Sequence, residues 1–117
     1  MNYSVLFYES KADLAQPDSR ESGELRGQWM SFLQALTGAG VMRGGAGLQP
    51  PSMATTVRLT GGQRQVQDGP FADTREQLGG FVLLETPNLD AALEWAARAP
   101  CASTGCVEVR PMLPEDK

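Results

Sequence analysis

The residues best suited to chemistry gather in one run between Asp68 and Phe81, DGPFADTREQLGGF. Its Gly-Pro and Gly-Gly pairs restrict and free the backbone in opposite ways, so the run is held in a specific path, and such loops often carry binding groups. If Asp68 faces an apolar cavity, it can act as a base near neutral pH or anchor a polar ligand. In the alternative interpretation, its side chain accepts backbone N–H bonds and only fixes the turn.

Arg75 lies in the same run and also has two interpretations. In one, its guanidinium closes over the cavity and binds a ligand carboxylate through two parallel hydrogen bonds. In the other, residues 73–76 (DTRE) form a capped helical turn that leaves Arg75 in solvent. The glycines at 79 and 80 lead into an apolar run rather than into a helix, so they are not interpreted as a phosphate-binding loop.

Four other residues complete the candidate site. Glu108 and Arg110 share one face of a predicted last strand, where they either form an ion pair across an interface or contact a ligand. Tyr8 and Phe71 either belong to the core or line the walls of a pocket. The sequence therefore predicts Asp68 as the catalytic residue, and these four together with Arg75 as ligand contacts.

Histidine is absent from the chain, which removes the commonest general base and the commonest metal ligand. A Ser-His-Asp or Cys-His nucleophile within one chain is therefore excluded. The two cysteines, Cys101 and Cys106, are too few for a zinc site without histidine partners, and we expect reduced thiols rather than a disulfide. The residues require no metal and no organic cofactor.

Composition points to one domain over residues 1–113, followed by a loose tail at 114–117. A chain of 117 residues, of which 41% are hydrophobic, can bury one ordinary core. Its net charge is −4 and it has no Lys/Arg cluster, so we expect no binding to nucleic acid. Residues 1–9 form neither a basic leader nor a long apolar segment, which predicts a cytoplasmic protein that does not enter the membrane.

Hydrophobic periodicity predicts the elements that position these residues. The two helices are expected to begin at a cap in residues 18–21 and at the cap residue Asn88. Their core-facing residues are expected to be Leu25, Trp29, Phe32, Leu33 and Leu36 in the first and Leu89, Ala92, Leu93 and Ala96 in the second. A polar loop is expected over residues 9–17, and strands over residues 3–8, 41–48, 55–59, 64–68, 81–85 and 106–111.

The resulting order is β-α-β, a β-hairpin, and β-α-β. This order predicts an α+β sandwich with both helices on one face of a mainly antiparallel sheet. The chain has no further helix to cover the other face. Because the same face of a second copy would cover it, we predict a homodimer with the two sheets face to face.

The DGPF sequence at residues 68–71 resembles the D-G-P-F signature of the YCII-related proteins. Further matching stretches follow in the expected order at residues 47–51, 92–96 and 107–111, so the resemblance covers nearly the whole chain. It implies a ferredoxin-like fold that pairs into a dimeric α/β barrel.

The resemblance implies less about activity. Related proteins of this fold include small isomerases, dehalogenase-like enzymes and monooxygenases, and some members are encoded or fused beside extracytoplasmic-type sigma factors. In the wider family a histidine–aspartate pair has been suggested as catalytic. Asp68 matches the aspartate, but this chain has no histidine to complete the pair.

Three functional hypotheses follow. The first is a small-molecule binding protein or enzyme whose cavity has Asp68 as its polar centre. The second is a partner-binding module without catalytic activity, for example a regulator associated with a sigma factor, which predicts an exposed apolar patch. The third is a structural dimer whose signature only builds the turn. A closed pocket with a polar centre would favour the first hypothesis.

Overall fold

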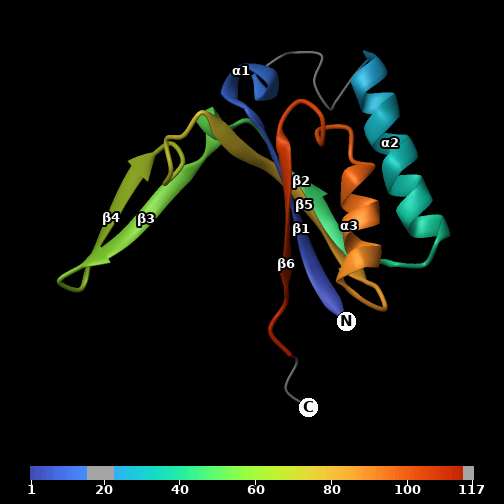
Figure 1. The fold of residues 1–117 in the computed structure, drawn as a ribbon. Coiled ribbons are helices and arrows are strands. Elements are labelled where there is room, and N and C mark those ends of the chain that lie inside the picture. Colours follow the sequence, from blue (N-terminus) through green and yellow to red (C-terminus); the bar gives the residue numbers. More distant parts are fainter. Residues whose placement is uncertain (16–22, 115–117) are drawn as a thin grey trace.

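The computed structural model describes residues 1–15 and 23–114. Its centre is a four-stranded antiparallel sheet in the order β2-β5-β1-β6, with the helices α2 and α3 on one face (Figure 1). The strands of this sheet are β1 (Asn2–Ser10), β2 (Met42–Gly47), β5 (Glu76–Glu85) and β6 (Cys106–Pro111). The helices are α1 (Lys11–Leu14), α2 (Gly23–Gly38), the 3₁₀ helix η1 (Pro51–Met53) and α3 (Leu89–Ala97).

This element order confirms the fold class predicted from the sequence, an α+β, ferredoxin-like β-α-β-(β-hairpin)-β-α-β sandwich. Among the described helices, none combines the length and the apolar character that a membrane span needs. Of the predicted loose tail at 114–117, all but Pro114 lies outside the described residues.

Strand β1 lies inside the sheet and shows the alternation that a half-buried strand requires. Tyr3, Val5 and Phe7 are buried on the face that the helices cover. Leu6 and Tyr8 lie on the other face, which we call the open face, and they are partly exposed. The strand is longer than the predicted 3–8 because it pairs with β5 along its whole length.

Helix α2 packs against β1 through its periodic apolar residues. Trp29, Phe32 and Leu36 are buried, which confirms the predicted inner face of this helix. The ring of Phe7 meets two of them edge to face, with centroid distances of 5.0 Å to Trp29 and 6.0 Å to Phe32. The predicted cap at residues 18–21 lies outside the described residues.

Helix α3 begins at the predicted cap, where Asn88 Oδ1 accepts a backbone N–H hydrogen bond at 2.9 Å. Its predicted inner face was partly wrong, since Leu89 and Leu93 are each 45% exposed whereas Ala92 and Ala96 are buried. The alanines are four residues apart and therefore form one ridge, and their small side chains let the helix lie close to the sheet.

The first part of the predicted polar loop, residues 9–15, instead contains the end of β1 and the one-turn helix α1. The Ser10 hydroxyl caps this turn by accepting the Asp13 backbone N–H at 3.1 Å. Leu14 is only 5% exposed. The turn therefore places the apolar side chain of Leu14 in the core.

The helical turn predicted at residues 73–76 does not form, because β5 begins at Glu76 rather than at Phe81. The added strand residues pair with the end of β1. The buried Gln77 anchors the bend before the strand, since its Nε2 donates to the Ala72 carbonyl at 2.8 Å. Strand pairing and this amide outweigh a local cap, which contributes only about 1 kcal/mol.

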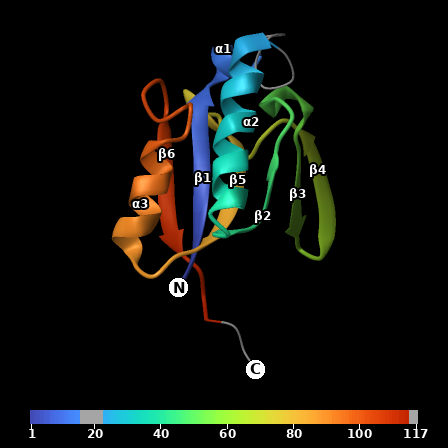
Figure 2. The same ribbon diagram turned by 90° about the vertical axis from the view of Figure 1, so that its right-hand side faces the viewer.

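Strands β3 (Thr55–Thr60) and β4 (Gln63–Asp68) form a separate two-stranded sheet. Gly61 and Gly62 have φ angles of 58° and 80°, the positive values that a tight hairpin turn needs. The hairpin projects from the end of the main sheet, on the side opposite the helices (Figure 1), and Figure 2 shows it beyond β2. It makes the radius of gyration 15.8 Å, against about 13 Å for a compact domain of this length.

We predict that Gly45 in β2 cannot be replaced by alanine without loss of stability. It has a φ of +149°, and an added Cβ would lie 2.5 Å from the Phe81 carbonyl oxygen of the paired strand. Gly45→Ala should therefore lower the free energy of unfolding by about 1–3 kcal/mol in urea titrations. Gly47→Ala is the matched control, because nothing lies within 4 Å of its added Cβ. Equal losses in both variants would contradict the prediction.

Candidate ligand-binding pocket

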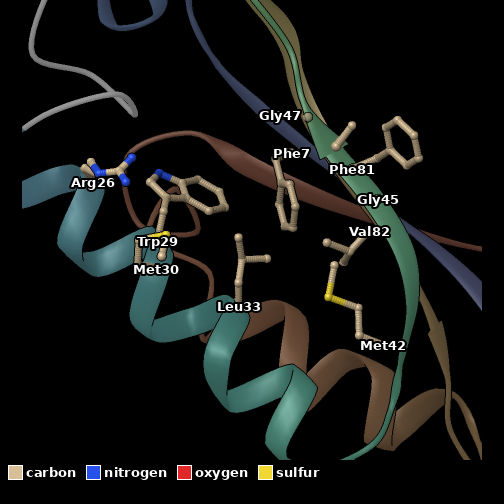
Figure 3. A pocket seen from close by; sticks show the side chains of 12 residues that line it. Phe7, Arg26, Trp29, Met30, Leu33, Met42, Gly45, Gly47, Phe81 and Val82 are labelled. Carbon is tan, nitrogen blue, oxygen red and sulfur yellow. The ribbon is translucent and has the colours of Figure 1, made fainter.

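An apolar cavity of about 220 Å³ lies between helix α2 and the β2–β5 edge of the main sheet (Figure 3). It is lined by Phe7, Arg26, Trp29, Met30, Leu33, Met42, Gly45, Ala46, Gly47, Gly80, Phe81 and Val82. Figure 3 shows the side chains of Trp29 and Leu33 facing Phe7 and Val82 across the cavity. The wall formed by α2 follows from helical periodicity, because residues 26, 30 and 33 lie on one side of a helix.

Part of the wall on the sheet side consists of backbone. Gly45, Gly47 and Gly80 carry no side chain at positions where the two paired strands face α2. The glycine-rich stretch of β2 therefore leaves room for the cavity. Sequence reasoning missed this pocket, and its usable signal was the combination of these glycines with the helix positions that face them.

Chemically the cavity combines aromatic and sulfur-containing side chains with one charge. Phe7 and Trp29 present ring edges, Met30 and Met42 present thioethers, and Arg26 is the only charged residue among those that line the cavity. Figure 3 places Arg26 at one end of the row of α2 side chains. The arrangement can bind an apolar ring and place an anionic substituent of that ring near the guanidinium.

The six residues predicted from the sequence lie elsewhere, and none of them lines this cavity. Asp68 is exposed at the end of β4, opposite Thr55. Phe71 is 74% exposed, with the Arg58 guanidinium 4.9 Å above its ring. These two residues therefore lie at the base of the hairpin rather than in a closed pocket of one chain.

The turn after Asp68 is held by other groups. Thr56 Oγ1 donates to the Gly69 carbonyl at 2.7 Å, and the Gly69 N–H donates to the Ala54 carbonyl at 2.7 Å. In the part of the chain that the structure describes, no donor reaches the Asp68 carboxylate within hydrogen-bonding distance. These contacts show how the turn is fixed without the Asp68 side chain.

The remaining candidates lie on or beside the open face of the sheet. Tyr8 is on β1, and Arg110 Nε donates to Glu108 Oε2 at 2.7 Å on the neighbouring β6. The structure thus brings Tyr8, Glu108 and Arg110 to one surface, with the last two paired within one chain. Arg75 is exposed just before β5, and a polar cleft there also includes Thr104.

Neither cysteine forms a disulfide, as predicted: Cys101 is buried and Cys106 is exposed. Cys106 lies beside Tyr8 on the open face, and its Sγ donates to Glu76 Oε1 at 3.8 Å. Partial burial, followed by the negative charge of Glu76, raises the pKa of Cys106. Cys106 is therefore a neutral hydrogen-bond donor near pH 7 rather than a reactive thiolate.

Comparison with known proteins finds a matching family and a relative of similar length. The YCII-related domain family matches residues 1–116. An uncharacterised protein of Rhizobium meliloti (strain 1021) is 36% identical over 114 residues, which cover 96% of this chain and 92% of that protein. Because this relative is uncharacterised, it suggests no activity for the present chain.

One solved structure shares the fold at low sequence identity. It is the 5-chloro-2-hydroxyhydroquinone dehydrochlorinase of Burkholderia phenoliruptrix AC1100 in complex with 2,5-dihydroxybenzoquinone. The TM-score is 0.56 at 14% sequence identity, over 97% of this chain and 94% of that chain. At this identity the likeness shows a common fold and nothing about a common reaction.

We predict that Asp68→Ala leaves stability nearly unchanged, with a loss below about 0.5 kcal/mol, because the residue is exposed. Thr56→Val is the matched variant: it removes the 2.7 Å bond to the Gly69 carbonyl and should cost about 1 kcal/mol. Thermal unfolding of both variants beside the wild type tests this. If Asp68→Ala destabilises as much as Thr56→Val, the carboxylate does fix the turn.

We predict that Glu76→Gln lowers the pKa of Cys106, because it removes the carboxylate whose charge opposes ionisation of the thiol. Thiolate absorbance measured against pH reports the change, with Cys106→Ser as the blank that identifies the signal. The titration of the Glu76→Gln variant should begin at a lower pH than that of the wild type. Identical titration curves would show that Glu76 does not act on this thiol.

Proposed function

The chain belongs to the YCII-related domain family, and on that premise we propose that it is a small-molecule binding protein or enzyme whose ligand occupies the cavity between α2 and the β2–β5 edge. The observation that carries the proposal is the cavity itself, apolar over nearly all its lining and provided with one cationic side chain, Arg26. Apolar walls with a few placed polar groups are typical of ligand sites.

The size of the cavity supports a compact ligand. An apolar cavity of about 150 Å³ is large enough for benzene, and this one measures about 220 Å³. A single substituted ring fits that volume, whereas drug-sized ligands occupy about 300–1,000 Å³. With Arg26 as the only charged lining residue, the favoured class is a planar aromatic compound that carries one anionic group.

The solved structure of similar fold is consistent with a ligand of this size. That dehydrochlorinase was determined with 2,5-dihydroxybenzoquinone, a six-membered ring with polar substituents. The compound is of the size that the cavity between α2 and the sheet would hold. This agreement concerns the size of the ligand alone.

A catalytic role for Asp68 is a separate part of the proposal. The residues that line the cavity include no carboxylate and no other side chain that exchanges a proton near neutral pH. Asp68 with Phe71, Tyr8, Arg75, Glu108 and Arg110 would form a site only where a second copy encloses the side of the sheet away from the helices. Binding in the cavity and reaction at Asp68 are therefore separable.

We further propose that the chain is a homodimer whose open sheet faces pack together. Leu6, Phe81 and Leu83 on that face are only partly buried, and both helices of the sandwich lie on the opposite side (Figure 1). A second copy of the same face would bury these side chains, which is the self-complementary contact of a twofold dimer.

The alternative function is a regulatory or partner-binding module without catalytic activity. A specific observation favours it, namely the exposure of Val57, Leu59 and Val66 on the hairpin, at 60%, 76% and 58%. An apolar patch of this kind marks an interaction surface. The presence of the apolar cavity beside α2 ranks this function second.

Binding of benzoate, compared with its neutral analogue benzamide, tests the proposed site. Loss of one charge-assisted hydrogen bond costs about 1.5–3 kcal/mol. Arg26→Gln should therefore weaken benzoate binding by about 10- to 100-fold in isothermal titrations and leave benzamide binding unchanged. Arg98→Gln is the control, because that guanidinium lies 4.4 Å over Trp95 on α3 and not at the cavity.

Two results would contradict the proposal. Benzoate that binds with equal affinity to the Arg26→Gln and Arg98→Gln variants would show that the anion is not held at the cavity. The absence of saturable binding by either compound to the wild type would remove the single-ring ligand class.

A further inference from the structure

We propose that the β3–β4 hairpin is an arm that clasps a second copy of this chain. The hairpin arm is defined as residues 55–68, and its contact surface as the face that carries Val57, Leu59 and Val66. This inference rests on the proposed homodimer and adds a second interface to it, distinct from the packing of the open sheet faces.

The arm has one apolar and one polar face. Val57 lies directly opposite Val66, and Leu59 lies opposite Arg64, so alternation places these side chains on the same face. Arg58 lies opposite Gln65 on the other face. An amphipathic two-stranded sheet requires a cover for its apolar face, because an isolated hairpin is only marginally stable in water.

Residues 1–15 and 23–114 of the arm's own chain do not provide that cover. Val57, Leu59 and Val66 are 60%, 76% and 58% exposed. The arm projects away from the main sheet instead of folding back onto it (Figure 1), which is the cause of the large radius of gyration of 15.8 Å. The apolar face of the arm is therefore exposed to solvent, although the arm itself is folded.

The base of the arm is held at a fixed angle. It enters after Pro50 and Pro51 and leaves before Pro70, residues whose rings restrict the backbone. The bond from Thr56 Oγ1 to the Gly69 carbonyl and the Arg58–Phe71 contact tie β3 to the connector that follows β4. A segment fixed in this way binds without the cost of ordering a loose loop.

The position of the arm selects a second copy as its partner. The arm and the open face border the same space, on the side of the sheet away from the helices (Figure 1). A twofold dimer formed through the open faces places the partner in that space, and the symmetry brings the partner's arm back to the first chain. One operation thus covers both the open face and the two arms.

Charge supports the same partner. The chain as a whole has a net charge of −4. The arm carries Arg58 and Arg64 against the single acidic residue Asp68 and is therefore net positive. A positive arm is attracted to the acidic body of another copy of this chain.

Two substitutions of equal chemistry on opposite faces of the arm test the inference. Leu59→Asp places a carboxylate opposite Arg64 on the apolar face, and Gln65→Asp places one opposite Arg58 on the polar face. Each variant creates an opposite-charge pair across the arm, so both should retain the fold of the wild type. Circular dichroism and thermal unfolding check this in each case.

The readout is the dissociation constant of self-association, from sedimentation equilibrium. Leu59→Asp should raise it at least tenfold, and Gln65→Asp should change it less than about threefold, because only the first puts a charge into an apolar contact. If the wild type dimerises and the two variants have equal effects, the proposed contact of the arm with the partner is wrong. The proposed sheet-to-sheet dimer is then not contradicted. A wild type that stays monomeric at roughly 100 µM, where micromolar association would be nearly complete, overturns both and leaves the apolar face to a different protein.

Discussion

The molecule is governed by a mismatch between a sheet with two faces and a chain with helices for only one of them. Aromatic and aliphatic side chains of α2 seal one side of β1 around Phe7 and Trp29. The opposite side keeps Leu6, Phe81 and Leu83 partly in contact with solvent. Burial of such side chains drives association. The face of the sheet under α2 is therefore buried within the chain, whereas the open face is available for association.

The apolar cavity and the polar side chains lie on different sides of the sheet, whereas one active site usually contains both. The helix side holds an apolar cavity with a lone guanidinium from Arg26 and no acid or base. The open side collects the polar chemistry, with Tyr8, the Glu108–Arg110 pair and the thiol of Cys106. If the protein is an enzyme, its ligand and its proton-transferring groups must meet across this division.

Local signals in the sequence predicted local structure well. The spacing of Trp29, Phe32 and Leu36 predicted the buried face of α2, and Asn88 predicted the start of α3, because helical periodicity and caps depend on near neighbours. The segment at residues 73–76 was mispredicted because pairing with the distant β1 decides it. The cavity could not be predicted from reactive residue types, since it is made of glycines and apolar side chains brought together by tertiary packing.

The glycines of β2 also limit which lining residues of the proposed site can be exchanged to alter its ligand preference. A wall built from backbone at Gly45 and Gly47 has no side chains to lengthen or shorten, and at Gly45 a new one would collide with the neighbouring strand. The opposite wall, at Arg26, Met30 and Leu33, is carried by one face of a single helix. Selection or engineering can therefore change the shape and charge of the cavity at these helix positions, whereas Gly45 on the sheet side has no room for a side chain.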